Sequence, residues 1–186
     1  MAGRAQEAKQ TGQGVKPPYI SQNIWKPFFE KMRTRSVPST KMLSYEELTA
    51  YGLPSPPALQ SAIKFLGLID EKAYPTDRFK LIQATGEQWK KNLEGIVRTA
   101  YKDLLDMHPL EHAKYEDVLN YFVHKHSAAS SQKMAKSFAV LCQMAGLSSP
   151  AFEKMRSLDA RDSAPHPPRS DRQDRVVSGG TPAPRT

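Results

Sequence analysis

Only one cysteine, Cys142, occurs among the 186 residues, which excludes an internal disulfide and fits a reducing compartment. Long apolar runs are also absent, so no segment reaches the length that spans a membrane. The first residues, MAGRAQEAKQTGQG, lack the apolar stretch of a secretory signal. These absences predict a cytoplasmic protein that makes no membrane contact.

Sequence motifs for catalysis, nucleotide binding and metal binding are missing as well. The chain contains neither GxxxxGK[ST] nor GxGxxG, the two glycine-rich patterns that bind nucleotide phosphates. His108 and His112 have the spacing of two metal ligands on a helix, but Pro109 between them indicates a loop or a helix start. Cys142 lies on an apolar stripe, where a buried thiol is expected. We therefore expect no metal, no cofactor and no enzymatic activity.

Both ends of the chain are poor in large apolar side chains. Residues 159–186 read DARDSAPHPPRSDRQDRVVSGGTPAPRT, and the first residues are similarly polar. Such segments bury too little apolar surface to offset the entropy lost on ordering. We expect a disordered arm over residues 1–19, a folded domain over 20–148 and a disordered tail over 149–186.

Positive charge is in excess throughout the chain. Lys and Arg number 27 against 19 Asp and Glu, and the formal net charge is +8. The excess is spread over both halves of the core and both ends. This balance is compatible with a polyanionic partner, and it is equally common in proteins whose cations are simply solvated.

Apolar spacing and helix-capping patterns predict three helices in the first half of the core, over residues 23–34, 44–52 and 55–66. The second begins with the capping pattern Ser44-x-x-Glu47. The third begins at Ser55, which is followed by two prolines, and Gly67 is a natural end for it.

The next stretch, DEKAYPTDRFKLI at residues 70–82, predicts a small β-hairpin. It contains a charged, Pro-containing turn, after which Phe79, Lys80 and Leu81 alternate as strand residues do. Two short helices, a capped third helix and a hairpin are the order of a winged-helix domain. The sequence therefore predicts a mainly α protein, with a winged-helix-like part at 20–82 and a three-helix extension at 83–148. The alternative is a generic helical domain with one incidental hairpin.

Several segments also resemble a bacterial domain family of unknown function, which occurs as small stand-alone proteins. These segments are IKFLGLID, YPTDRFKLI, TAYKDLLDMHP and SSQKMAKSFAVLCQMAGL, and FLGLID with PTDRF is the most specific part. The similarity covers about residues 18–148. It implies a mostly helical, winged-helix-like fold of prokaryotic or phage origin. It implies no activity, so no functional residue can be transferred.

The predicted fold and charge favour a non-enzymatic protein that binds nucleic acid, with DNA as the expected partner, or regulates something that does, through helix 55–66 and the wing at 70–82. The candidate contacts carry basic, amide or hydroxyl side chains: Arg33, Arg35, Lys41, Gln60, Ser61, Lys64, Lys72 and Arg78. Helix 55–66 offers few bidentate donors, so binding would rely on phosphates and be salt-sensitive. The alternative is a protein-interaction adaptor or an accessory subunit of a bacterial complex.

Overall fold

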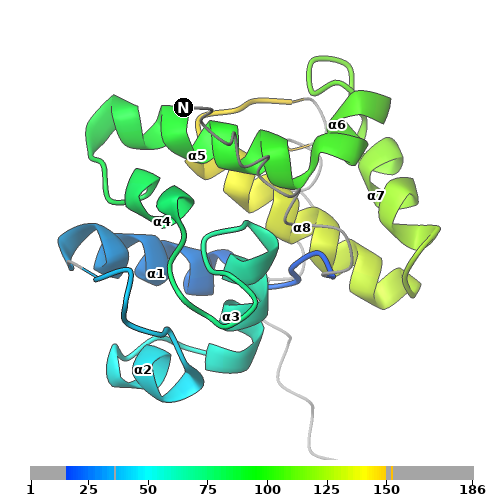
Figure 1. The fold of residues 1–186 in the computed structure, drawn as a ribbon. Coiled ribbons are helices and arrows are strands. Elements are labelled where there is room, and N and C mark those ends of the chain that lie inside the picture. Colours follow the sequence, from blue (N-terminus) through cyan, green and yellow to red (C-terminus); the bar gives the residue numbers. More distant parts are fainter. Residues whose placement is uncertain (1–15, 36, 150–151, 153–186) are drawn as a thin grey trace, which may run out of the picture.

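The computed structural model describes residues 16–35, 37–149 and 152, and within these residues the chain forms helices and no strand (Figure 1). In chain order the helices are α1 Gln22–Thr34, α2 Tyr45–Ala50, α3 Pro56–Phe65, α4 Asp77–Leu81, α5 Gly86–Ala100, α6 Lys102–Met107, α7 Tyr115–Val123 and α8 Ala128–Met144. None of them combines the length and the apolar character needed to cross a membrane.

The core is built around the apolar face of α1. This face has helical spacing and is fully buried at Trp25, Phe28, Phe29 and Met32. The Trp25 indole Nε1 donates a hydrogen bond of 3.1 Å to Ser137 Oγ on α8. The Phe29 ring meets the Trp89 ring of α5 edge to face, with centroids 5.8 Å apart. Helix α1 therefore packs against two helices from the second half of the chain.

Two helical hairpins, α2–α3 and α7–α8, flank this core (Figure 1). Ser44 caps α2, as predicted, by accepting a hydrogen bond from the Glu47 backbone N–H. Ser55 precedes α3, also as predicted, but its side chain makes no capping hydrogen bond. Gly67 follows α3 with φ +69°, a conformation that glycine adopts without steric cost.

The β-hairpin wing predicted over residues 70–82 is wrong, and with it the winged-helix-like fold class. Among the described residues the segment has only an isolated bridge between Ile69 and Pro75, followed by α4. The Asp70 carboxylate accepts the N–H groups of Lys72 and Tyr74, both at 2.9 Å, and so closes a tight local turn. Pro75 has no N–H with which to extend the ladder.

The three residues taken for a strand belong to α4 instead. Phe79 and Ile82 are buried three positions apart, whereas Lys80 and Leu81 between them are both exposed. That spacing matches a helix, because a strand would bury alternate residues. The short apparent alternation over residues 79–81 was therefore misleading.

The three-helix extension predicted over residues 83–148 is divided further than expected. Helix α5 ends at Ala100, the Tyr101 backbone departs from helical geometry with φ −109° and ψ 27°, and α6 follows. The Tyr101 ring is buried between Phe65 and Phe138, with centroid distances of 5.0 and 4.7 Å. The predicted three-helix extension thus contains the four helices α5, α6, α7 and α8.

The predicted arm and tail lie largely outside the described residues. Phe152 is described, is 3% exposed, and its ring centroid lies 5.9 Å from that of Phe138. Ser149 is also buried, and its hydroxyl donates to the Ala113 carbonyl at 3.3 Å. Ser149 and Phe152, which the prediction placed in the tail, therefore contact the core.

Replacing Asp70 with Ala should lower the free energy of unfolding by about 1 kcal/mol, because two backbone N–H groups lose their acceptor. The matched control is Glu71→Ala. Its exposed carboxylate makes an ion pair with Lys64, so the loss should stay below about 0.5 kcal/mol. Urea unfolding followed by circular dichroism measures both. Equal losses would contradict the role assigned to the Asp70 turn.

Candidate nucleic-acid interface

Basic side chains gather around the C-terminal end of α1. Lys31 and Arg33 lie in the last turn of the helix, and Arg35 is its C-terminal cap residue. Because Phe29 and Met32 point into the core, the residues between and after them are directed toward the surface. The carbonyl end of a helix also favours positive charge.

Tyr51, the residue after α2, is a common contact of Lys31, Arg35 and a further cation, Lys41. The Arg35 guanidinium lies 4.8 Å from the centroid of its ring, and Lys41 Nζ lies 5.4 Å from it. Lys31 Nζ donates hydrogen bonds to the carbonyls of Tyr51 at 2.6 Å and Gly52 at 2.9 Å. These contacts bring together cations from α1 and from the loop before α2.

Arg33 is held by a different ring. Its guanidinium lies 4.8 Å above the centroid of the Trp89 indole, which is buried except for 8% of its surface. Guanidinium groups stack well on aromatic faces and keep their outward donors available. We call Lys31, Arg33, Arg35 and Lys41 the α1 cluster.

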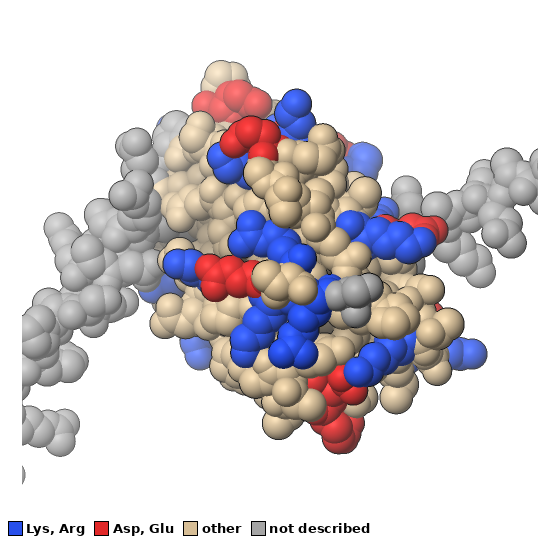
Figure 2. Space-filling model, turned by 90° about the vertical axis from the view of Figure 1, so that its left-hand side faces the viewer, with Lys and Arg blue, Asp and Glu red and all other residues tan. Residues whose placement is uncertain are grey.

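The α1 cluster keeps most of its positive charge. Within the described part of the chain, Lys31, Arg33 and Arg35 have no carboxylate within 4.0 Å, and only Lys41 is paired, with Glu47 at 2.5 Å. The other ion pairs are Lys64–Glu71, Lys80–Asp77, Lys90–Glu87, Arg98–Glu94 and Lys102–Asp106. Figure 2, which faces this end of the molecule, shows Lys and Arg gathered across its middle, with acidic side chains mainly toward its edges.

The Lys41–Glu47 ion pair shifts the pKa of both of its groups. The hydrogen bond to Glu47 raises the pKa of Lys41, and the same bond lowers the pKa of Glu47. Both groups therefore stay charged at neutral pH. One acidic group in a set of four cations leaves a net positive surface.

The predicted contacts on α3 are engaged within the protein. The Gln60 side-chain amide donates to the Leu43 carbonyl at 2.8 Å, and the Ser61 hydroxyl donates to the Pro57 carbonyl at 3.1 Å. Lys64 is paired with Glu71 at 2.5 Å. Helix α3 thus presents fewer available donors than its sequence indicates.

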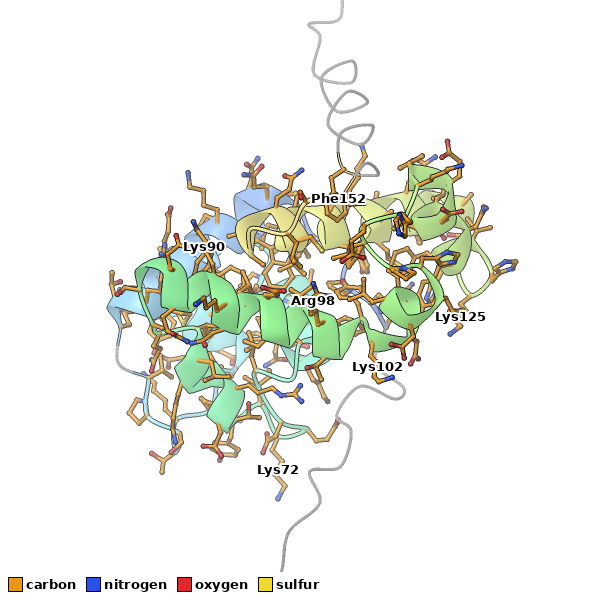
Figure 3. All side chains as sticks on the ribbon, turned by 90° about the horizontal axis from the view of Figure 1, so that it is seen from above. Lys72, Lys90, Arg98, Lys102, Lys125 and Phe152 are labelled. Atoms are coloured by element: carbon orange, nitrogen blue, oxygen red, sulfur yellow. The ribbon has the colours of Figure 1, made fainter. Side chains whose placement is uncertain are left out.

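Lys72 and Arg78 come from the segment predicted to be the wing. Lys72 is exposed on the Asp70 turn and projects away from the helices (Figure 3). Arg78 is half-buried on α4. Neither contacts the Tyr51 or Trp89 ring. Of the predicted set, Arg35 and Lys41 share the Tyr51 ring, and Arg33, two residues before Arg35, lies over Trp89.

Sequence reasoning missed Lys31, Tyr51 and Trp89. The alternating run Lys31-Met-Arg33-Thr-Arg35 is a local signal from which Lys31 could have been added. The two rings carry no such signal, because each meets its cation only through packing of distant segments.

Two observations on the described residues concern metal binding and thiol chemistry. No group of three or more His, Cys, Asp or Glu side chains is placed to hold a metal ion. Cys142 is fully buried, and burial raises the pKa of its thiol far above the usual range. Such a thiol is a poor nucleophile.

The family model described as a family of unknown function (DUF5343) matches residues 18–151, most of the chain. The chain therefore belongs to this family. Searches of curated proteins and of solved structures found no significant match.

Replacing Lys41 with Ala should raise the pKa of Glu47 toward its ordinary value, because the charged hydrogen bond is lost. Carbon-13 NMR titration of the carboxylates measures this. Glu46 is the internal control, since its pKa is lowered chiefly by Ser44 and should not change.

The lowered pKa of Glu47 also makes the stability of the fold depend on pH. A carboxyl group whose pKa is lower when folded stabilises the fold above its unfolded pKa. That contribution is lost as pH falls through the folded pKa, and Lys41→Ala should reduce the loss. An unchanged Glu47 titration in the variant would show that the ion pair does not form in solution.

Proposed function

We propose that this protein binds nucleic acid through the α1 cluster. The observation that supports this most is that three cations, Lys31, Arg33 and Arg35, are held at one surface by rings and carbonyls instead of carboxylates. Their charge is left available for an anionic ligand, and basic patches of this kind are typical of surfaces that contact nucleic-acid phosphates.

Two features of the cluster suit phosphate groups. Arg33 and Arg35 each present a planar guanidinium, which matches two phosphate oxygens at once. Both guanidinium groups lie over rings, which limits the side-chain freedom lost on binding. Lys41 and Lys31 add positive charge beside them.

The contact is directed at the backbone of the nucleic acid rather than at its bases. Sequence readout requires several free donors on an element that enters a groove. The α3 residues predicted for this, Gln60 and Ser61, bond to carbonyls of the protein itself. Binding is therefore largely independent of base sequence and strongly dependent on salt.

An adaptor function is the second candidate, and a separate feature favours it. Met42 and Tyr74 are 47% and 38% exposed, and their backbones adjoin through a hydrogen bond from Leu43 N–H to the Ala73 carbonyl. Exposed Met and Tyr side chains are common in protein interfaces. A protein partner would contact this surface and need not touch Arg33.

Changing Arg33 and Arg35 together to Gln should weaken binding of a fluorescent DNA duplex about tenfold, or about 1.4 kcal/mol. The slope of log affinity against log salt should become shallower by about 2, because two phosphate contacts are lost. Fluorescence anisotropy at several salt concentrations measures both quantities.

The control removes the same number of cations from elsewhere, through Arg98→Gln with Lys102→Gln. Both side chains are already paired with carboxylates on their own helices, so affinity should change less than about twofold. Equal losses in the two variants would show that only total charge matters. The absence of any binding by the unmodified protein at low salt would refute the proposal and favour the adaptor.

A further inference from the structure

Glu47, in the first turn of α2, is the acidic residue that is paired with the α1 cluster. Its carboxylate Oε1 lies 2.5 Å from Lys41 Nζ, and its side chain is only 24% exposed. Lys41 Nζ also lies 5.4 Å from the centroid of the Tyr51 ring, and the Arg35 guanidinium lies 4.8 Å from the same centroid. Glu47 is therefore bonded to a cation that shares one ring with Arg35.

The surroundings of the Glu47 carboxylate favour an anion. The hydrogen bond from Lys41 is the main cause that lowers the pKa of Glu47, and Tyr51 and the charge of Arg35 lower it further, although burial opposes them. A phosphate oxygen is an anionic acceptor of the same kind, to which the Lys41 ammonium donates equally well. The carboxylate therefore takes a place on Lys41 that also suits a phosphate of the ligand.

The cap of α2 uses the backbone of Glu47 and not its carboxylate. Ser44 Oγ accepts a hydrogen bond of 3.3 Å from the Glu47 backbone N–H. In a complete capping box, the carboxylate three residues after the cap residue would accept the backbone N–H of that residue in return. Here the Glu47 carboxylate is bonded to Lys41 instead. It can therefore leave Lys41 without removing the Ser44 cap.

We propose that Glu47 is an internal competitor of the nucleic acid: a backbone phosphate replaces its carboxylate on Lys41 when the α1 cluster binds. This inference rests on the proposed function and names the residue that limits its affinity. A strand held by Arg33 and Arg35 brings its next phosphates to Lys41 at a high effective concentration. The freed carboxylate turns to solvent, and its lost ion pair reduces the net gain from the new phosphate contact.

A double-mutant cycle tests the proposal, with the full-length protein and a fluorescent DNA duplex at low salt. Glu47→Gln removes the competitor and keeps the backbone cap, so affinity should rise about threefold to fivefold, as the loss of a partly exposed ion pair predicts. In the Lys41→Gln background the same change should alter affinity less than about 1.5-fold, because no ammonium is freed.

Glu46→Gln is the matched control. It removes the same charge from the neighbouring position in the first turn of α2, where Ser44 and not Lys41 is the chief partner of the carboxylate. Affinity for the duplex should change less than about 1.5-fold in this variant.

The outcomes separate competition by Glu47 from nucleic-acid binding itself. If the unmodified protein does not bind the duplex, the proposed function is wrong. If it binds but Glu47→Gln binds no more tightly than Glu46→Gln, the exchange on Lys41 alone is overturned. A full gain that persists in the Lys41→Gln background would show that Glu47 acts only through its charge on the whole cluster, and would also overturn the exchange.

Carbon-13 NMR titration of the Glu47 carboxyl gives a measure that does not depend on affinity. In the complex its pKa should be higher than in the free protein, because the Lys41 hydrogen bond is lost and a phosphate charge lies nearby. An unchanged Glu47 titration in the saturated complex would show that the carboxylate stays on Lys41, and would overturn the proposal.

Discussion

The rest of the structure depends on the burial of the aromatic face of α1. Trp25 stacks on Phe29 with ring centroids 5.6 Å apart, meets Phe28 edge to face, and donates its indole N–H to Ser137. Each such large apolar side chain contributes roughly 1.5–3 kcal/mol when fully buried. The hydrogen bond fixes the position of α1 along α8, because an unpaired indole N–H in this core would be costly. The first and second halves of the chain are joined through this helix.

This packing also decides where the candidate site lies. Phe29 contacts Trp89 from within the core, and Arg33, one helical turn later, covers the same indole from outside. The end of α1 is thereby held against α5 while its cations reach the surface. Tyr51 provides a second ring for Arg35 and Lys41 from the neighbouring α2. The rings therefore restrict Arg33, Arg35 and Lys41, which are long side chains with many rotamers when unrestrained.

Among the described residues, the cations on α4, α5 and α6 and those of the α1 cluster have different partners. On α4, α5 and α6, Lys80, Lys90, Arg98 and Lys102 form pairs with carboxylates three or four residues away on the same helix, whereas Arg78 and Lys91 belong to none of these pairs. At the α1 cluster, Lys31, Arg33 and Arg35 lie on rings or carbonyls, which leave the positive charge in place. Part of a mild overall excess of positive charge is therefore concentrated at the α1 cluster.

Most helices were predictable because their signals are local. The capping group of Ser44, the prolines after Ser55 and the glycine at position 67 act within one turn, and the structure places helix ends close to them. The prediction of a hairpin over residues 70–82 was wrong because the apolar pattern there was too short to distinguish a strand from a helix. Burial of Phe79 and Ile82 made it a helix. In the candidate site, Arg33, Arg35 and Lys41 were predictable as basic side chains, whereas their aromatic partners were not.

The sequence by itself determined the helical periodicity, most of the helix ends, the burial expected for Cys142 and the excess of positive charge. Each of these follows from residues within a few positions of one another. Only the tertiary structure decided which cations remain unneutralised. An ion pair such as Glu87 with Lys90 could be expected from sequence, because the two residues are three positions apart on one helix. Arg33 on Trp89 and Arg35 on Tyr51 exist only because the core packs distant segments together.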